Sequence, residues 1–331
     1  MPRRWRGYAQ YLESLYGRRV YRIGLDAGFS CPNRDERRQG GCAFCDGTGA
    51  AAMYQRRCES SFTHASSFDE EISKTAPLAV PSLQERCTSI KRQIEHGRSF
   101  LQRRYKAELF SAYFQAWTNT YADIDTLKTL YDAALEEGPF AELIISTRPD
   151  CITDEVLDLL EGYKGRVGRV WVELGLQSSN DKSLALLGRG HDSECYITSA
   201  NALHSRGIGV CTHMVVGLPG EGQEDFKRTC MCINSVKSEA VKIHNLHVCG
   251  GTRLHDWYAQ GEVSVASLRR HVENSICLLR HLHKDIVVER LICETPNHRL
   301  VAPRTFADKS AFLTLLEKTM EERGVWQGDL T

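Results

Sequence analysis

Strand-like and helix-like segments alternate regularly along this chain of 331 residues, and few folds accept that order. Short runs of β-branched and aromatic residues predict strands at 20–26, 109–117, 141–148, 168–176, 209–217 and 240–248. Helical patterns separate the later strands, at 123–138, 152–163, 193–207 and 223–239. Because parallel neighbours need a long crossover connection, the alternation predicts βαβ units and a parallel sheet.

The spacing of these strands narrows the architecture. From the second strand on, their centres lie roughly thirty to forty residues apart, as a βαβ repeat requires. Six strands suit an open or partial barrel better than a closed eightfold one, although spacing alone does not separate it from a doubly wound sheet. Both folds place their chemistry at the carboxyl ends of the strands.

The segments outside this alternation set the expected domain limits. We expect a core at 1–250 with a basic N-terminal arm at 1–19, and a mostly helical extension at 251–331 that packs on it. No apolar run approaches eighteen residues, so no transmembrane helix and no membrane partner are predicted. Thirteen cysteines without a secretory signal pattern predict a reducing compartment, the cytoplasm.

Charge is balanced over the whole chain but unevenly distributed. The formal net charge is +0, yet the segments 1–22 and 86–106 are both strongly basic. Clusters of this kind are most often solvated faces, and they are also compatible with a polyanionic partner.

Three cysteines stand in the loop CPNRDERRQGGCAFC, whose other residues are too polar to pack a core: Cys31, Cys42 and Cys45. Two of them form a C-x-x-C pair, a spacing that lets a short loop wrap one metal centre. Three thiolates match an iron–sulfur cubane with one iron left open, because each iron accepts one protein thiolate. The alternative is a zinc site completed by a distant ligand such as Cys58 or His64.

Seven fragments in a fixed order carry a family resemblance: DAGFSCPNRDERRQGGCAFC, AYFQAWTNTYA, ISTRPDCI, VWVELGLQSSND, LLGRGHD, HMVVGLPGE and VKIHNLHVCGGTRL. Together they resemble the radical S-adenosylmethionine (SAM) superfamily over about residues 5–310. The branch they resemble contains the bacterial YhcC and YtqA (MnmL) proteins and is related to the radical domain of the elongator catalytic subunit. The resemblance implies an α/β fold, a partial (β/α)6 TIM-like barrel with a helical C-terminal extension and a cluster loop at 27–50.

The resemblance also implies a set of site residues. Cys31, Cys42 and Cys45 would hold a [4Fe–4S] cluster, whose open iron would chelate the amino and carboxylate groups of SAM. The cofactor contacts would be Phe44, Thr118, Asn119, Thr120, Glu173, Gln177, Arg189, His213, Gly217 and Val248.

The resemblance assigns most of these contacts to a part of the cofactor. Phe44 would lie beside the adenine, whose edge would meet the backbone near Val248. The triplet TNT at 118–120 stands where the superfamily more often has GGE, at the methionine amine. Gln177 would reach the ribose, and Arg189 would pair with the carboxylate through two parallel donors.

Three further contacts complete the set that the resemblance implies. Glu173 lies among apolar strand residues, where an acid is costly unless it is hydrogen-bonded, and would contact ribose or substrate. His213 falls where relatives often place an acidic ribose ligand. Gly217 opens a tight turn in which the backbone would approach the cofactor.

The implied reaction is the reductive cleavage of SAM to a 5′-deoxyadenosyl radical, with an electron donor such as flavodoxin or ferredoxin. The implied substrate is the carboxymethylaminomethyl side chain of a wobble uridine in transfer RNA. The basic segments fit phosphate contacts, and Tyr8, Tyr11, Tyr16 and Tyr21 are candidate stacking groups. A small metabolite or peptide is the alternative substrate, and a zinc-stapled binding protein is the alternative that is not an enzyme.

Overall fold

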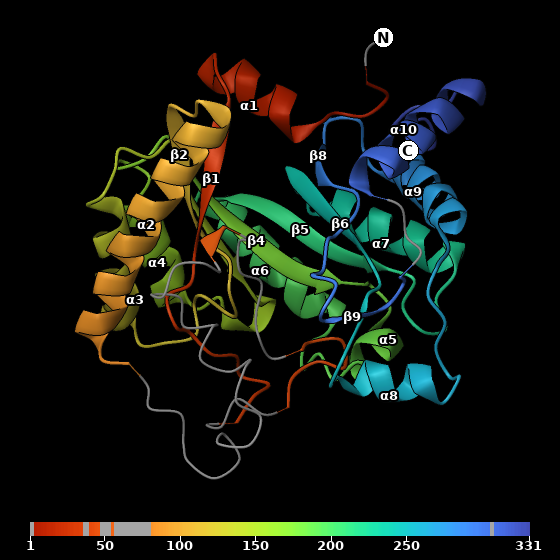
Figure 1. Cartoon of the computed structure of the whole chain (residues 1–331), viewed down its shortest axis with the longest axis horizontal. Coiled ribbons are helices and arrows are strands. Elements are labelled where there is room, and N and C mark those ends of the chain that lie inside the picture. The colour runs from red at the N-terminus through yellow and green to blue at the C-terminus, as the bar shows by residue number, and fades with distance from the viewer. Residues whose placement is uncertain (1–2, 36–39, 47–53, 56–80, 305–307) are drawn as a thin grey trace.

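The computed structural model describes residues 3–35, 40–46, 54–55, 81–304 and 308–331. Its centre is a curled, seven-stranded parallel sheet, a half-barrel, in the order β1-β2-β3-β4-β5-β6-β8 (Figure 1). The strands are β1 Val20–Leu25, β2 Leu109–Phe114, β3 Glu142–Thr147, β4 Arg169–Gln177, β5 Gly209–Val216, β6 Ala240–Asn245 and β8 Val287–Arg290. The expected partial barrel is therefore confirmed, with one more strand than the sequence indicated.

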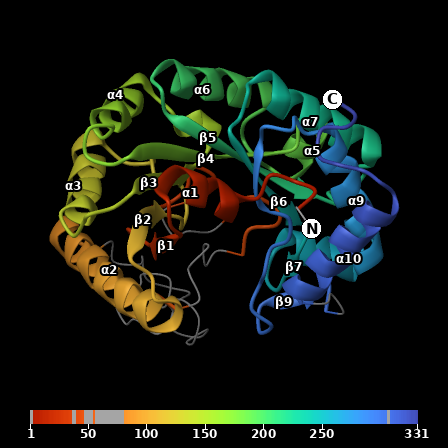
Figure 2. The same cartoon turned by 90° about the horizontal axis from the view of Figure 1, so that it is seen from above.

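Helices cover the outside of the half-barrel, as the view in Figure 2 shows. The helices of the described residues are α1 Tyr8–Tyr16, α2 Leu83–Tyr105, α3 Ile124–Leu135, α4 Asp154–Gly162, α5 Asp181–Leu186, α6 Ser193–Ser205, α7 Gln223–Ser235, α8 Arg253–Ala259, α9 Leu268–His281 and α10 Lys309–Glu322, with a 3-10 turn at Pro149–Cys151. Of these, α1 lies across one end of the half-barrel, and α5 and α8 lie at the opposite end (Figure 1). Side-chain caps start many of them, for example Ser82 on α2 and Asp123 on α3, because they satisfy amides that lack a partner in the first turn. Within the described residues, none of these helices has the length and apolar character needed to cross a membrane.

Strand β4 shows how the sheet separates its two faces. Val172, Leu174 and Leu176 belong to the main apolar core, which lies between the sheet and the helices. Successive side chains on a strand point to opposite faces, so Glu173 and Gly175 face the inside of the half-barrel. The polar side chain of this strand, Glu173, therefore lies inside the half-barrel.

The C-terminal extension contributes to the barrel as well as packing on it. β8 pairs in parallel with β6, with Ala240 opposite Val287. A second, two-stranded sheet joins β7 (Val248–Cys249) to β9 (Leu300–Ala302) in antiparallel register. β8 has only four residues, which is too short a pattern to stand out in the sequence.

The basic arm at the N-terminus is bound to the C-terminal part of the chain. The Val288 amide donates to the carbonyl of Arg6 (2.7 Å), and the Gln327 amide donates to that of Arg4 (3.0 Å). The Arg4 guanidinium also lies 4.5 Å above the ring of Trp326. α1 follows and lies over the end of the half-barrel away from the cysteine loop (Figure 1).

Candidate active site

The cysteine loop lies beyond the carboxyl end of β1, where the alternation predicts chemistry (Figure 1). Cys42 is buried, and Cys31 and Cys45 are half-buried. Two distant segments hold the loop. The Ala43 amide donates to the carbonyl of Leu187 (2.8 Å), and the Leu254 amide, in the first turn of α8, donates to the carbonyl of Ala43 (2.9 Å).

Each of the three thiols has a polar donor beside its sulfur. The contacts are Asn33 Nδ2 to Cys42 Sγ at 3.5 Å, Arg189 Nη1 to Cys42 Sγ at 3.5 Å, Arg34 Nη2 to Cys45 Sγ at 3.2 Å and Arg148 Nη1 to Cys31 Sγ at 4.0 Å. Burial alone would raise the pKa of Cys42, but Arg189, Asn33 and Arg148 outweigh it and hold that pKa below its ordinary value. These donors therefore favour the thiolate form of Cys42, the form that binds metals.

The spread of the three sulfurs bears on which metal fits. Among the described residues, the potential ligand atoms that lie within 4.8 Å of one another are those of Glu173, Cys211 and His213, not those of the loop cysteines. Thiolates on one tetrahedral zinc would lie about 3.8 Å apart, given a Zn–S distance of about 2.3 Å. At least one pair of loop sulfurs is therefore more than 4.8 Å apart, which fits a cluster in which each thiolate takes its own iron. Cys58 and His64, the ligands of the zinc alternative, lie outside the described residues.

Arg189 and Gln177 converge beside Cys42. Gln177 ends β4 with a φ of 72°, and Arg189 Nη2 donates to the carbonyl of Gly175 at 2.9 Å. A Cβ placed on Gly175 would lie 2.5 Å from Arg189 Nη2 and 2.8 Å from Gln177 Nε2, so only glycine leaves both side chains where they are. Arg189 Nε is buried without a partner among the described residues. The structure thus brings these two predicted residues together.

Replacing Gly175 with alanine should displace both side chains while leaving the fold intact. The atoms that the new methyl group meets are the ends of flexible side chains, which move at little cost. If Arg189 binds the SAM carboxylate, we expect affinity for SAM to fall about tenfold or more, because a hydrogen bond to a charged group contributes about 1.5–3 kcal/mol. Calorimetric titration of the iron-reconstituted protein measures this. Gly165→Ala, where nothing lies within 4 Å, is the control; equal affinity in both variants would contradict the assignment.

The triplet Thr118, Asn119 and Thr120 is buried where β2 ends. Asn119 Nδ2 donates to the carbonyl of Ser146 (2.8 Å), and Thr120 Oγ1 donates to the carbonyl of Cys151 (2.7 Å). These bonds tie the end of β2 to β3 and the turn after it. The cofactor role expected for the triplet stays a prediction.

Phe44, Gly217 and Val248 lie around one apolar cluster. Phe44 packs against buried residues that include Leu246 and Val248. Gly217 follows β5 with a φ of 91°, a conformation that favours glycine. The two residues expected at the adenine therefore share a wall next to the cysteine loop, and their contact with a cofactor stays a prediction.

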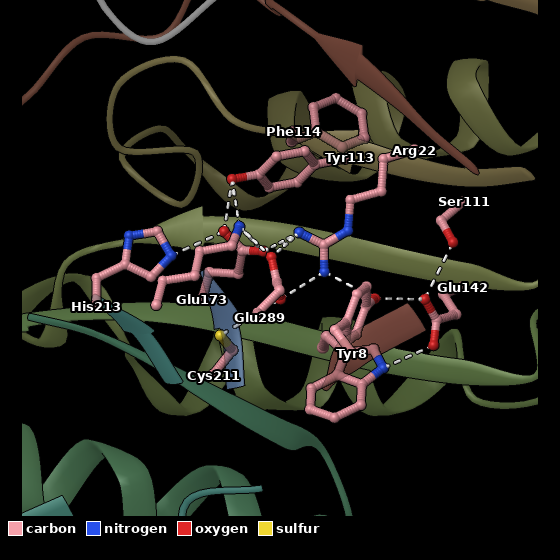
Figure 3. A network of polar contacts seen from close by, with 12 residues as sticks. Tyr8, Arg22, Ser111, Tyr113, Phe114, Glu142, Glu173, Cys211, His213 and Glu289 are labelled. Atoms are coloured by element: carbon pink, nitrogen blue, oxygen red, sulfur yellow. Dashed lines mark hydrogen bonds and ion pairs between the residues drawn. The ribbon is translucent and has the colours of Figure 1, made fainter. Parts of the chain in front are cut away.

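Glu173 lies at the centre of a polar network inside the half-barrel (Figure 3). Its side chain is fully buried, and its two oxygens accept from four donors: Arg22 Nη1 (2.8 Å), Lys242 Nζ (2.5 Å), Tyr113 OH (2.5 Å) and His213 Nε2 (2.9 Å). Burial would raise the pKa of Glu173, but Lys242, Arg22 and His213 outweigh it and hold that pKa well below its ordinary value. This carboxylate is ionised and fully paired.

A second acid balances the two cations. Glu289 on β8 binds Arg22, with one Nη2–Oε2 contact at 2.7 Å, and binds Lys242 Nζ at 2.7 Å. These two acids and two bases thus pair with one another, so each of the four charges has an opposite partner. Sequence reasoning missed Arg22, Lys242 and Glu289. The available signal was a charged residue in the middle of an apolar strand, as in AVKIHN.

His213 lies between this network and the residues that converge on Gly175. Because a carboxylate only accepts, the Nε2 that faces Glu173 carries the proton, and Nδ1 points away from the network (Figure 3). Burial lowers the pKa of His213 despite Glu173, so the ring is neutral and Nδ1 is an acceptor. In the sheet His213 lies opposite Gly175, the residue on which Arg189 and Gln177 converge.

Comparisons with known proteins agree with this geometry. Residues 39–233 match the radical SAM superfamily model, and residues 238–322 match the radical SAM C-terminal domain model. Protein YhcC of Escherichia coli (strain K12) is 32% identical over 315 residues, covering 95% of this chain and 91% of that protein. The tRNA uridine(34) acetyltransferase of Methanocaldococcus infernus is 34% identical over 124 residues, covering 36% of this chain and 22% of that protein.

The archaeal Methanocaldococcus infernus Elp3 with an N-terminal deletion has a similar fold, with a TM-score of 0.61 and 23% sequence identity. The match covers 72% of this chain and 59% of that chain. The two family models together span most of the length of this chain, and the half-barrel agrees with them. The chain therefore belongs to the radical SAM superfamily of enzymes.

Proposed function

We propose that the chain binds a [4Fe–4S] cluster and SAM and acts on transfer RNA. When bound, the cluster and SAM supply the one-electron cleavage that yields methionine and a 5′-deoxyadenosyl radical. The observation that carries the proposal is the set of three thiols, each with its own donor, beside the converging Arg189 and Gln177. Membership of an enzyme superfamily removes the zinc-stapled binding protein from the alternatives.

The residues of the site divide the work of holding the cofactor. Cys31, Cys42 and Cys45 hold the irons. Arg189 binds the methionine carboxylate, for which its planar fork is suited, and its unpartnered Nε is a further donor there. The remaining assignments are Gln177 at the ribose, Thr118, Asn119 and Thr120 at the methionine amine, Phe44 and Val248 at the adenine, and Gly217 at a close backbone approach.

Glu173 and His213 act as one unit in this proposal. His213 Nδ1 accepts a hydrogen bond from a ribose hydroxyl, as an acid does in relatives, and Glu173 keeps the proton on the other nitrogen. Glu173 itself has no oxygen left for a ligand, because four protein donors occupy it. It therefore positions His213 and does not contact SAM.

The substrate we propose is the carboxymethylaminomethyl group of a wobble uridine. The similarity to a protein named as a tRNA uridine(34) acetyltransferase and the Elp3-like fold support it. The electron donor would be a flavodoxin or ferredoxin, and the location would be the cytoplasm. A small metabolite or peptide is the alternative substrate.

Mass spectrometry of modified nucleosides separates these substrates. In transfer RNA from a deletion strain, we expect one wobble-uridine derivative to disappear and its precursor to accumulate. The purified, reduced enzyme should then form 5′-deoxyadenosine faster when that precursor RNA is added. An unchanged nucleoside profile would remove transfer RNA and leave the small-molecule alternative.

A further inference from the structure

The two basic segments of the sequence meet on one surface. Tyr21, at the start of β1, stacks on Tyr105, at the end of α2, with ring centroids 5.6 Å apart and planes inclined by 19°. The contact brings residues 18–21 beside residues 103–106. We call this surface the basic–aromatic patch; it consists of Arg18, Arg19, Tyr21, Arg103, Arg104, Tyr105 and Lys106.

The patch carries a surplus of exposed positive charge. All five of its cations are exposed. Arg18 pairs with Glu108 at 3.1 Å and Arg19 pairs with Glu13 at 2.9 Å. In the described part of the chain, no ion pair involves the other three cations, Arg103, Arg104 and Lys106. Five cations against two acids leave a net charge of +3.

Most of the other cations of the basic segments make contacts within the protein; exposed Arg92 on α2 is an exception. On α2, Arg86 is buried and Lys91 faces Glu136 and Glu137 at 3.5 Å. The arginines near the N-terminus bind the C-terminal part of the chain, as the contacts of Arg4 and Arg6 show. Apart from Arg92, the cations of both segments that have no ion pair and no contact with the C-terminal part of the chain therefore lie mainly in the patch.

An exposed aromatic ring distinguishes this patch from an ordinary solvated face. Tyr105 is 50% exposed, and the Arg104 guanidinium lies 5.7 Å from its ring centroid. A tyrosine ring among cations suits an unpaired base or a ribose, which stacks while its phosphates meet the charges.

Lys106 carries its charge at a strained backbone position beside Tyr105. It ends α2 in the left-handed conformation, with a φ of 55°, where glycine is the residue without strain. A lysine at such a position places a charge at the patch at the expense of helix stability.

We propose that the basic–aromatic patch binds the backbone of transfer RNA and stacks Tyr105 on an exposed base or ribose. This inference rests on the proposed function. The patch lies at the amino end of β1 and the cysteine loop beyond its carboxyl end, and a six-residue strand spans about 20 Å. An electron donor has to approach the cluster itself, so the distant patch does not suit it. A stem-loop of transfer RNA is long enough to contact the patch while its loop reaches the active site.

The test compares two charge reversals of equal size in filter-binding titrations at three salt concentrations, with bulk transfer RNA from a deletion strain as the probe. The patch variant is Arg103→Glu with Arg104→Glu and Lys106→Glu. The control is Arg269→Glu with Arg270→Glu and Lys309→Glu, all exposed and outside the patch. We expect the patch variant alone to lose at least tenfold in affinity. Its slope of log affinity against log salt should flatten by about 2, since each phosphate contact contributes about 0.7–0.9.

A neutral variant tests the stacking separately. Tyr105→Ala should weaken binding several-fold with an unchanged salt slope, because it removes a ring and no charge. Formation of 5′-deoxyadenosine without RNA should be unchanged in all variants, which confirms that they fold.

Four outcomes would overturn the proposal. Equal losses in the patch variant and the control would reduce the effect to net charge. Undiminished binding by the patch variant would place the RNA elsewhere and leave the proposed substrate standing, whereas no salt-dependent binding by the wild type would remove the substrate as well. A loss confined to flavodoxin-supported turnover, with RNA binding retained, would assign the patch to the electron donor.

Discussion

Replacing Lys242 with methionine should lower the free energy of unfolding by about 3–5 kcal/mol, because it leaves buried carboxylates without their partner. Lys242 Nζ contacts both Glu173 and Glu289, and all three side chains are nearly or fully buried. Chemical denaturation measures the change. The control is Lys91→Met, which breaks exposed ion pairs and should change the free energy of unfolding by less than about 1 kcal/mol.

The loss in the Lys242 variant should depend on pH. In the wild type the pKa of Glu173 is lowered, so its contribution to stability is full above the unfolded pKa of about 4.3 and is lost only as the pH falls toward the folded value. Without Lys242, burial raises the pKa of the remaining acids, and the variant loses stability as the pH rises through that value. The gap between the two proteins should therefore narrow when the pH falls from about 8 to about 5. A gap that is constant across this range would show that the network does not act through charge.

Alanine at Cys31, Cys42 or Cys45 should abolish binding of the iron–sulfur cluster. The wild type reconstituted without oxygen should carry four irons and four sulfides per chain, because a cubane has four of each and needs all three thiolates here. Iron and sulfide analysis with visible absorption measures the loading. Cys232→Ala, at a half-buried position on α7, should load normally. Stoichiometric zinc, with activity retained after iron chelation, would contradict the assignment.

The sequence predicts the sheet well because each strand carries its own signal. Six strands, with helices between the later ones, are visible from local patterns, and the half-barrel follows from their order. β8 was missed because four residues, Val287–Arg290, give little local pattern. Its place in the sheet depends on its pairing with β6, which is a long-range contact.

Only part of the candidate site can be predicted from the sequence. The three cysteines are visible as a motif, and the convergence of Gln177 and Arg189 agrees with the family pattern. The partners of Glu173 are not visible in the same way. Arg22 lies 151 residues away in the sequence and Lys242 lies 69 away, so only the folded sheet brings them together.

The contacts that surround the cysteine loop also set an order of events during protein synthesis. Arg189, which contacts Cys42, follows it by 147 residues, and Arg253, which donates to the carbonyl of Gly41, follows that glycine by 212. At about 5–20 residues per second, a ribosome needs about 10–40 s to make the longer stretch. The three cysteines are therefore synthesised well before the residues that will enclose them. Iron delivered during translation would therefore reach a loop that still lacks its contacts with Arg189 and Arg253. Iron delivered afterwards would reach a loop that these residues already enclose.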